Sequence, residues 1–220
     1  MCANFKPLTL EQTKPLNLPV IPFAYPDEVY PGYELPLLFK SDQGLEWRSV
    51  RFGLVPKWAT DLQIAKRTYN ARSETLLEKP SFQAAAMKCK FAVIPVTEFY
   101  EGKYIDQQPQ RWAVRRKDGQ AFYIAALYEI MKLNDQVIRS ATMLTIDAID
   151  HPMMKDFHEP GNVKRSVVVI PHHQLDEWLS LTTPQEMYRF MQGFPVEEFE
   201  CQHVPKTKIV KETPQLTFFD

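Results

Sequence analysis

The chain has 220 residues, of which 45% are hydrophobic, 24% charged and 12% aromatic. This composition is typical of a folded globular protein and excludes an intrinsically disordered one. The formal net charge is −1, so a nucleic-acid-binding surface would need a local cluster of cations. Eighteen prolines against seven glycines favour many stiff, irregular connections over long helices.

The first half of the chain predicts short elements. Residues 5–36 hold seven prolines and are expected to run as extended and turn segments, with a short helix around residues 8–14. Residues 35–39 and 47–54 are predicted as strands joined by a turn at Asp42-Gln43-Gly44. Helix is expected over residues 71–77 and 82–87, with a break at Pro80.

The second half is richer in apolar runs. Residues 91–96 predict a buried strand, and residues 99–104 either continue it or begin its partner. Residues 111–115 and 122–127 are predicted to form a hairpin around Lys117-Asp118-Gly119. Residues 143–146 and 167–170 predict two more buried strands. Residues 172–179 and 184–191 predict amphipathic helices, the second capped by Thr183 with Pro184 in its first turn.

These elements show no alternation of strand and helix that would indicate a parallel sheet. We therefore expect an α+β fold: a single domain over residues 2–220, built on a mostly antiparallel, barrel-like sheet with peripheral helices.

The cysteines and histidines give no sign of a metal site or a disulfide framework. Cys2, Cys89 and Cys201 are few and scattered, and His172 and His173 are adjacent rather than spaced to face one ion. We expect no metal and no cofactor. No signal sequence and no run of 18 apolar residues is present, so we expect a soluble, cytoplasmic monomer without a membrane partner.

Cys2 is the first candidate for chemistry. Its small side chain permits removal of Met1, which would place an α-amine and a thiol two carbons apart at the new N-terminus. The amine has an ordinary pKa of about 7.7–8.0, so part of it is unprotonated at neutral pH. An aldehyde reacts with such an amine to give a Schiff base, and the thiol then closes a five-membered thiazolidine.

Two other segments carry polar groups suited to a reaction. Residues 69–75 place Asn70, Arg72 and Glu74 close together inside a basic stretch, since residues 46–90 hold nine Lys/Arg against four Asp/Glu. Glu101 directly follows an apolar strand, where partial burial would raise its pKa and suit it to proton transfer.

These segments resemble one known family. Met1-Cys2, then FGLVPKWA at residues 52–59, NARSET at 70–75 and IPV…FYE at 94–101 occur in the order typical of the SRAP (SOS-response-associated peptidase) family. NARSET agrees at all six positions, and the resemblance runs from residue 2 to about residue 210. It implies the SRAP fold and a protein that shields abasic sites in single-stranded DNA during the DNA-damage response, through a covalent thiazolidine at Cys2.

The resemblance also implies roles for individual residues. Cys2 would form the crosslink, and Asn70 would orient the adduct near the N-terminal amine. Glu101 would transfer protons during opening of the sugar ring and Schiff-base formation. His158 is the expected active-site histidine, and Arg72 would contact a DNA phosphate.

Further DNA contacts are expected from the basic stretch. Lys57, Lys66, Arg67, Lys88 and Lys90 are candidates to follow the backbone, and Trp58 and Phe52 are candidates to stack on bases. His151 is the alternative to His158, because the alignment of this region leaves both open.

Several positions depart from the usual family pattern. Asn4 stands where arginine is usual, Glu98 where glycine is usual, and Gly102 where tryptophan is usual. Six residues, 159–164, separate His158 from Arg165, which is a longer loop than the family normally has. Arg165 is a candidate for the family arginine after this loop, and residues 203–206 resemble the family's closing segment.

Two other functions stay open at this point. Cys2 could serve as the N-terminal nucleophile of a cysteine peptidase, with activity limited to its own processing or directed at other chains. The basic stretch alone could serve a non-catalytic module that binds single-stranded DNA. Two of the three hypotheses predict an enzyme that uses Cys2. The peptidase would cleave peptides, and the crosslinking protein would use lyase-like Schiff-base chemistry.

Overall fold

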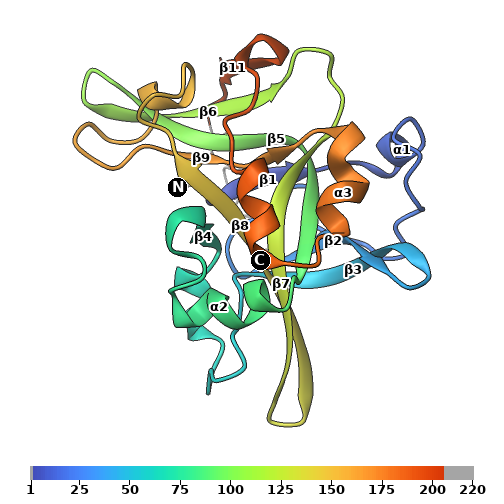
Figure 1. Cartoon of the computed structure of the whole chain (residues 1–220). Coiled ribbons are helices and arrows are strands. Elements are labelled where there is room, and N and C mark those ends of the chain that lie inside the picture. The colour runs from blue at the N-terminus through green and yellow to red at the C-terminus, as the bar shows by residue number, and fades with distance from the viewer. Residues whose placement is uncertain (1, 206–220) are drawn as a thin grey trace, which may run out of the picture.

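The computed structural model describes residues 2–205, and one mixed β-sheet dominates this part of the chain (Figure 1). Its strands are β1 (Asn4–Pro7), β2 (Glu34–Ser41), β3 (Gly44–Phe52), β4 (Asn70–Arg72), β5 (Phe91–Ile105), β6 (Gln108–Arg116), β7 (Phe122–Leu133), β8 (Gln136–Asp147), β9 (Arg165–Val167), β10 (Val169–Ile170) and β11 (Phe199–His203). The α-helices are α1 (Leu10–Thr13), α2 (Pro80–Met87) and α3 (Leu175–Leu179). Short 3-10 helices are η1 (Gln63–Arg67), η2 (Ser73–Thr75), η3 (Met154–Asp156), η4 (His172–Gln174), η5 (Pro184–Phe190) and η6 (Val196–Glu198).

Five of the strands close into a barrel. β5 pairs with both β2 and β7, and the path β7–β8–β3–β2 completes the ring. Within the ring every pairing is antiparallel except β3 with β8. The expected α+β fold, with a mostly antiparallel, barrel-like sheet and peripheral helices, is confirmed. The stretch of the predicted domain beyond residue 205, including Lys206, lies outside the described residues.

Both faces of the first part of β5, residues 91–96, are buried, which explains the unbroken apolar run there. Ala92 and Ile94 belong to one hydrophobic cluster, whereas Val93 belongs to another that includes Trp178 of α3. The Trp178 indole nitrogen donates a hydrogen bond of 2.9 Å to the Ala92 backbone oxygen, which fixes α3 against the barrel. Successive side chains of a strand point to opposite faces, so covering both faces requires apolar residues at every position.

Of the two hairpins predicted from the sequence, the structure confirms one and contradicts the other. The predicted hairpin of β2 and β3 is confirmed, with Ser41 opposite Gly44. The predicted hairpin of residues 111–115 and 122–127 is wrong, because β6 pairs with β5 and β11, while β7 pairs with β5, β8 and β10. The real turns are Asp106-Gln107 and Asn134-Asp135, whose positive φ angles of 46° to 62° match two-residue turns that follow the twist of the strands.

Residues 71–77 are not the expected helix. Asn70–Arg72 is a strand that pairs in parallel with β8, and Ser73–Thr75 is a 3-10 turn. The helix around residues 82–87 is confirmed, but Pro80 is its first residue rather than a break. The extended backbone at residues 70–72 puts Asn70 and Arg72 on the same side of β4, two positions apart.

The remaining elements agree with the sequence reading in outline. Residues 99–104 continue β5, and residues 143–146 and 167–170 are extended, within β8 and across β9 and β10. The helices expected after residue 171 are present, partly as 3-10 turns, and Thr183 caps η5 together with Glu186. Among the described residues, no helix has both the length and the apolar character needed to span a bilayer.

Candidate active site

Four residues far apart in the sequence come together beside the part of β5 that pairs with β6. Cys2 lies two residues before the start of β1, which pairs with β5 so that Asn4 lies opposite Tyr100, next to Glu101. Asn70 begins β4, and His158 follows η3. Each of the predicted catalytic residues therefore comes from a different segment of the chain: Cys2, Asn70, Glu101 and His158.

The Asn70 side chain holds Cys2 in place through the backbone of Cys2. The Asn70 nitrogen Nδ2 donates a hydrogen bond of 2.6 Å to the Cys2 backbone oxygen. The Cys2 side chain is buried, and its Sγ lies 3.6 Å from the Asn4 backbone oxygen. Burial and the nearby charge of Glu101 raise the pKa of the Cys2 thiol, so the resting thiol is protonated. The Asn70 oxygen Oδ1 is buried and makes no hydrogen bond with the described residues.

Glu101 and His158 form a buried pair in which the two groups are not both charged. The His158 Nε2 lies 3.6 Å from the Glu101 Oε2, which is longer than a hydrogen bond. Burial raises the pKa of Glu101 to about 7, although the Gly102 backbone N–H opposes this shift. Burial, helped by the charges of Lys164 and Arg165, lowers the pKa of His158 to about 4. At neutral pH the imidazole is therefore neutral, and Glu101 can both accept and donate a proton.

The loop after His158 is folded back on itself by one lysine. The Lys164 ammonium donates hydrogen bonds to the backbone oxygens of Phe157, His158 and Glu159, at 2.8, 3.2 and 3.3 Å. His158 has a φ of 66°, and its N–H donates a hydrogen bond of 2.7 Å to the Gly102 oxygen. These hydrogen bonds hold the imidazole of His158 beside β5.

His151, the alternative histidine, lies elsewhere and has a structural role. Its Nδ1 accepts hydrogen bonds of 3.2 Å from the backbone N–H groups of Met153 and Met154. Its ring packs against Phe194, with 4.5 Å between the ring centroids. Of the two candidates, His158 is the one beside Glu101.

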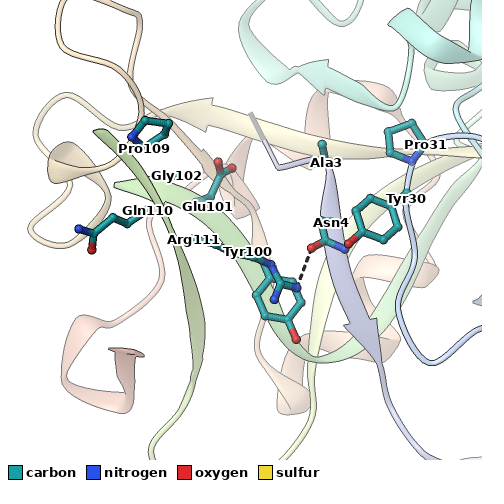
Figure 2. A pocket seen from close by; sticks show the side chains of 10 residues that line it. All are labelled: Ala3, Asn4, Tyr30, Pro31, Tyr100, Glu101, Gly102, Pro109, Gln110 and Arg111. Atoms are coloured by element: carbon teal, nitrogen blue, oxygen red, sulfur yellow. Dashed lines mark hydrogen bonds between the residues drawn. The ribbon is translucent and has the colours of Figure 1, made fainter. Parts of the chain in front are cut away.

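Two hollows flank Glu101 and share Gly102 and Pro109 in their walls. The first has a volume of about 590 Å³ and is lined by Tyr30, Tyr100, Glu101 and Arg111 among others (Figure 2). The second, of about 510 Å³, is lined by Tyr69, Arg72, Asn162, His158 and Arg165 among others. The two hollows therefore adjoin at Gly102 and Pro109, and we call them together the groove.

Arg111 is a site residue that the sequence reading missed. Its guanidinium carbon lies 3.4 Å from the centroid of the Tyr100 ring. Its Nη2 donates hydrogen bonds of 2.9 Å to the Asn4 Oδ1 and 2.6 Å to the Glu28 carboxylate. Asn4, where the family pattern has arginine, thus binds an arginine from β6. No local pattern marks Arg111, because only the register of β6 against β5 brings it here.

Comparison with known proteins identifies the family. Residues 20–211 match the family described as SOS response associated peptidase (SRAP). The chain belongs to this family. The SRAP fold expected from the sequence is confirmed with it.

Two curated relatives are 30% and 31% identical to this chain over the aligned residues. Abasic site processing protein YoaM of Bacillus subtilis is 30% identical over 161 residues, which cover 70% of this chain and 66% of that protein. Abasic site processing protein YoqW of Bacillus phage SPbeta is 31% identical over 161 residues, covering 70% and 67%. The alignment thus spans about two thirds of each relative.

Solved structures show the same fold over nearly the whole chain. A crystal structure of a Bordetella bronchiseptica protein matches with a TM-score of 0.86 at 25% identity, covering 93% of this chain and 100% of that one. A crystal structure of a Bacteroides thetaiotaomicron protein matches with a TM-score of 0.76 at 19% identity, covering 92% of both chains.

The predicted DNA-contacting residues of this SRAP chain lie at different distances from the groove. Arg72 is exposed and lines the second hollow beside His158. Trp58 is 57% exposed, and its indole nitrogen donates a hydrogen bond of 3.2 Å to the Pro80 oxygen. Lys66 and Arg67 are exposed in η1, and Lys57 borders the β7–β8 hairpin. Phe52 is fully buried between Phe5 and Tyr69, so its expected stacking on a base is wrong.

Lys88 and Lys90 are not brought to the groove. Lys90 immediately precedes β5 and lies eleven residues before Glu101, up to roughly 36 Å along an extended strand. Its ammonium pairs with the buried Glu129 carboxylate. Lys88 is exposed just after α2. A role of these two lysines in DNA binding stays a prediction.

Proposed function

We propose that this chain processes abasic sites in DNA, and that it does so by a covalent bond between Cys2 and the abasic sugar in single-stranded DNA. Family membership and two relatives named abasic site processing proteins support the general part. The convergence of Cys2, Asn70 and Glu101 is the observation that carries the specific part. In this proposal the protein acts as a cytoplasmic monomer that shields abasic sites during the DNA-damage response.

The first step is opening of the abasic sugar. The closed hemiacetal must lose the proton of its hydroxyl and gain one on the ring oxygen to give the aldehyde. Because its pKa is about 7, Glu101 is present in both protonation states at neutral pH and can deliver or take up this proton. His158 is neutral under the same conditions, and its Nε2, 3.6 Å from that carboxylate, is a second group that can transfer a proton.

The next steps join the protein to the aldehyde carbon. After removal of Met1, the Cys2 amine attacks this carbon, and the resulting hydroxyl leaves as water once it is protonated. The thiol sulfur then adds to the imine carbon, its proton passes to a base such as Glu101, and the nitrogen ends as a secondary amine. One aldehyde and one aminothiol thus give one thiazolidine and one water.

Trapping must compete with strand cleavage by β-elimination from the same imine. Thiol addition is intramolecular, and such closures reach effective molarities of about 10⁵ M or more when the geometry is favourable. Asn70 supports this geometry, because its hydrogen bond to the Cys2 oxygen restrains the residue that carries both nucleophiles. We expect trapping to exceed cleavage.

Intact-protein mass spectrometry with abasic single-stranded DNA tests the proposal. The adduct should have the mass of the chain without Met1 plus the oligonucleotide, less one water. Cys2→Ser should retain an amine, give a borohydride-trappable imine and cleave some DNA, whereas Cys2→Ala should give no stable adduct. A heat-stable adduct on the Cys2→Ala protein would exclude this mechanism.

The two other functions predict different results in the same assay. A peptidase would cleave peptides in a Cys2-dependent manner without any aldehyde. A simple DNA-binding module would bind abasic DNA equally well with or without Cys2 and form no adduct.

A further inference from the structure

Arg111 is held as a rigid platform beside the reaction centre. One face of its guanidinium lies against the Tyr100 ring, at 3.4 Å from the ring centroid. Asn4 and Glu28 fix its Nη2 from two directions, and Asn4 is itself anchored by a hydrogen bond of 3.2 Å to the Val29 oxygen. A guanidinium that is already fixed in one plane loses little freedom when a ligand stacks on it.

The charge of Arg111 is largely balanced within the protein. The Glu28 carboxylate pairs with it at 2.6 Å, and this carboxylate also accepts a hydrogen bond from the Tyr30 hydroxyl. A phosphate placed here would face Glu28 as well as Arg111. The arrangement therefore suits a flat, uncharged ring better than an anion, since guanidinium planes stack well on nucleobases.

The hollow in front of this platform is large enough and adjoins the abasic site. Its volume of about 590 Å³ lies within the roughly 300–1,000 Å³ typical of small-ligand pockets. Arg111 lies opposite Gly102 in the register of β6 and β5, one residue from Glu101. A Cβ added at Gly102 would meet no atom within 4 Å, so there is free space directly over the residue that both hollows share. In Figure 2, Tyr100, Arg111 and Asn4 form one wall of the hollow, and Glu101 lies further along the same strand as Tyr100.

We propose that this hollow is a nucleobase subsite, in which the base next to the abasic nucleotide stacks on the Arg111 guanidinium. The proposal rests on the proposed function, because it places the abasic sugar over Gly102 and Glu101. Arg111 is then a positioning residue that holds the strand in register with Cys2. Stacking accepts any base, so the subsite should show little preference among the four.

The test is equilibrium binding of single-stranded oligonucleotides that cannot react. The central position carries tetrahydrofuran, which mimics the abasic sugar without an aldehyde, and the neighbouring position on either side carries a base or a second tetrahydrofuran. In the unaltered protein, removing the base on one side should weaken binding by about five- to a hundredfold. Arg111→Ala should bind both oligonucleotides equally.

Two further variants separate stacking from charge and from folding. Arg111→Lys keeps the ion pair with Glu28 but has no plane, so it should also lose the dependence on the neighbouring base. Arg115→Ala is the matched control, since Arg115 lies on the same strand but pairs with Glu200 and lines a different hollow. It should keep the full dependence. Thermal unfolding midpoints establish that each variant is folded.

The outcomes distinguish the subsite from the proposed function. Equal affinity for oligonucleotides with and without the neighbouring base, in the unaltered protein, overturns the subsite. Full base dependence in Arg111→Lys overturns it too, because a point charge would then suffice. Covalent adduct formation is measured separately with true abasic DNA, and its absence would count against the Cys2 mechanism without changing the result of the binding assay.

Discussion

The Asn70 Nδ2 lies 2.6 Å from the backbone oxygen of Cys2, and this contact joins residues 68 positions apart. A side chain on β4 thereby restrains the first residues of the chain next to Glu101. The hydrogen bond is buried, and a short one of this kind fixes orientation more than it adds net stability.

Asn70→Ala should slow adduct formation more than it weakens DNA binding. Without the amide, Cys2 keeps its chemistry but loses the restraint on its position, and we expect a rate reduction of about 10- to 100-fold. Asn70→Asp should behave similarly, because a carboxylate cannot donate to the Cys2 oxygen. The measurements are single-turnover adduct formation and the affinity for tetrahydrofuran-containing DNA. A parallel loss of rate and affinity would place Asn70 in DNA binding instead.

Glu101→Gln should remove a titration from the rate of adduct formation. In the unaltered protein, burial raises the pKa of Glu101 to about 7, so its protonated fraction falls as the pH rises through neutrality. If ring opening needs the acid form, the rate per unprotonated amine should decrease above about pH 7. The variant should react more slowly and lack this limb. An identical pH profile in both proteins would show that another group transfers the proton.

The same substitution should change how stability depends on pH. The folded-state pKa of Glu101 is raised from 4.5 to about 7, so its stabilising contribution is complete below pH 4.5 and is lost as the pH rises to about 7. Relative to Glu101→Gln, the unaltered protein should lose up to about 3 kcal/mol of unfolding free energy across this window. His158 titrates in the opposite sense and lies 3.6 Å from Glu101, so both proteins are compared in a His158→Gln background, where its titration is absent. Urea unfolding at several pH values measures the difference in unfolding free energy between the two proteins.

The motifs predicted which residues meet, but long-range pairing decided how they meet. Asn70, Glu101 and Cys2 could be named because their segments have a recognisable order. The composition of residues 71–77 favours a helix, whereas the parallel ladder with Met143 and Thr145 makes residues 70–72 extended. Tertiary pairing overrides a local propensity that is worth only fractions of a kcal/mol per residue, about 0.7 at most for ordinary residues.

Arg111 shows the same limit for the site. Its place beside Tyr100 and Asn4 depends on the β5–β6 register, which the turn at Asp106-Gln107 sets. The turn at Lys117-Asp118-Gly119 predicts a hairpin of β6 with β7, but β6 pairs with β5 and β11 instead. A turn signal in the sequence indicates that the chain reverses, but it does not say which strands then lie side by side.

Arg72→Ala should weaken binding of single-stranded DNA and lower its salt dependence. Arg72 is exposed in the second hollow, on the same side of β4 as Asn70, where a phosphate of the bound strand would pass. Loss of one phosphate contact should reduce the slope of log K against log salt by roughly 0.7. Lys132→Ala is the matched control, because Lys132 is exposed near the tip of the β7–β8 hairpin. An unchanged slope in Arg72→Ala would mean that Arg72 does not contact the backbone.

Lys164→Met should raise the pKa of His158. Burial lowers this pKa to about 4, and the Lys164 charge adds to the shift. The substitution removes the charge and the three hydrogen bonds to the backbone of residues 157–159, which admits more water to the imidazole. Both effects favour the protonated ring. The measurement is an NMR titration of the histidine Cε1–H signals, with assignment by His158→Gln.

Lys155→Met serves as the control for Lys164→Met. Lys155 is an exposed lysine in η3, close to His158 in sequence, but it makes none of the three contacts that hold the loop. Its removal should leave the pKa of His158 near 4.

In Lys164→Met, the charged imidazole should pair with Glu101 below neutral pH and lower the pKa of the Glu101 carboxyl group. The decrease in the rate of adduct formation with rising pH should therefore begin at lower pH. A His158 pKa that is equal in both variants would mean that neither the loop nor its lysine sets the protonation state of the imidazole.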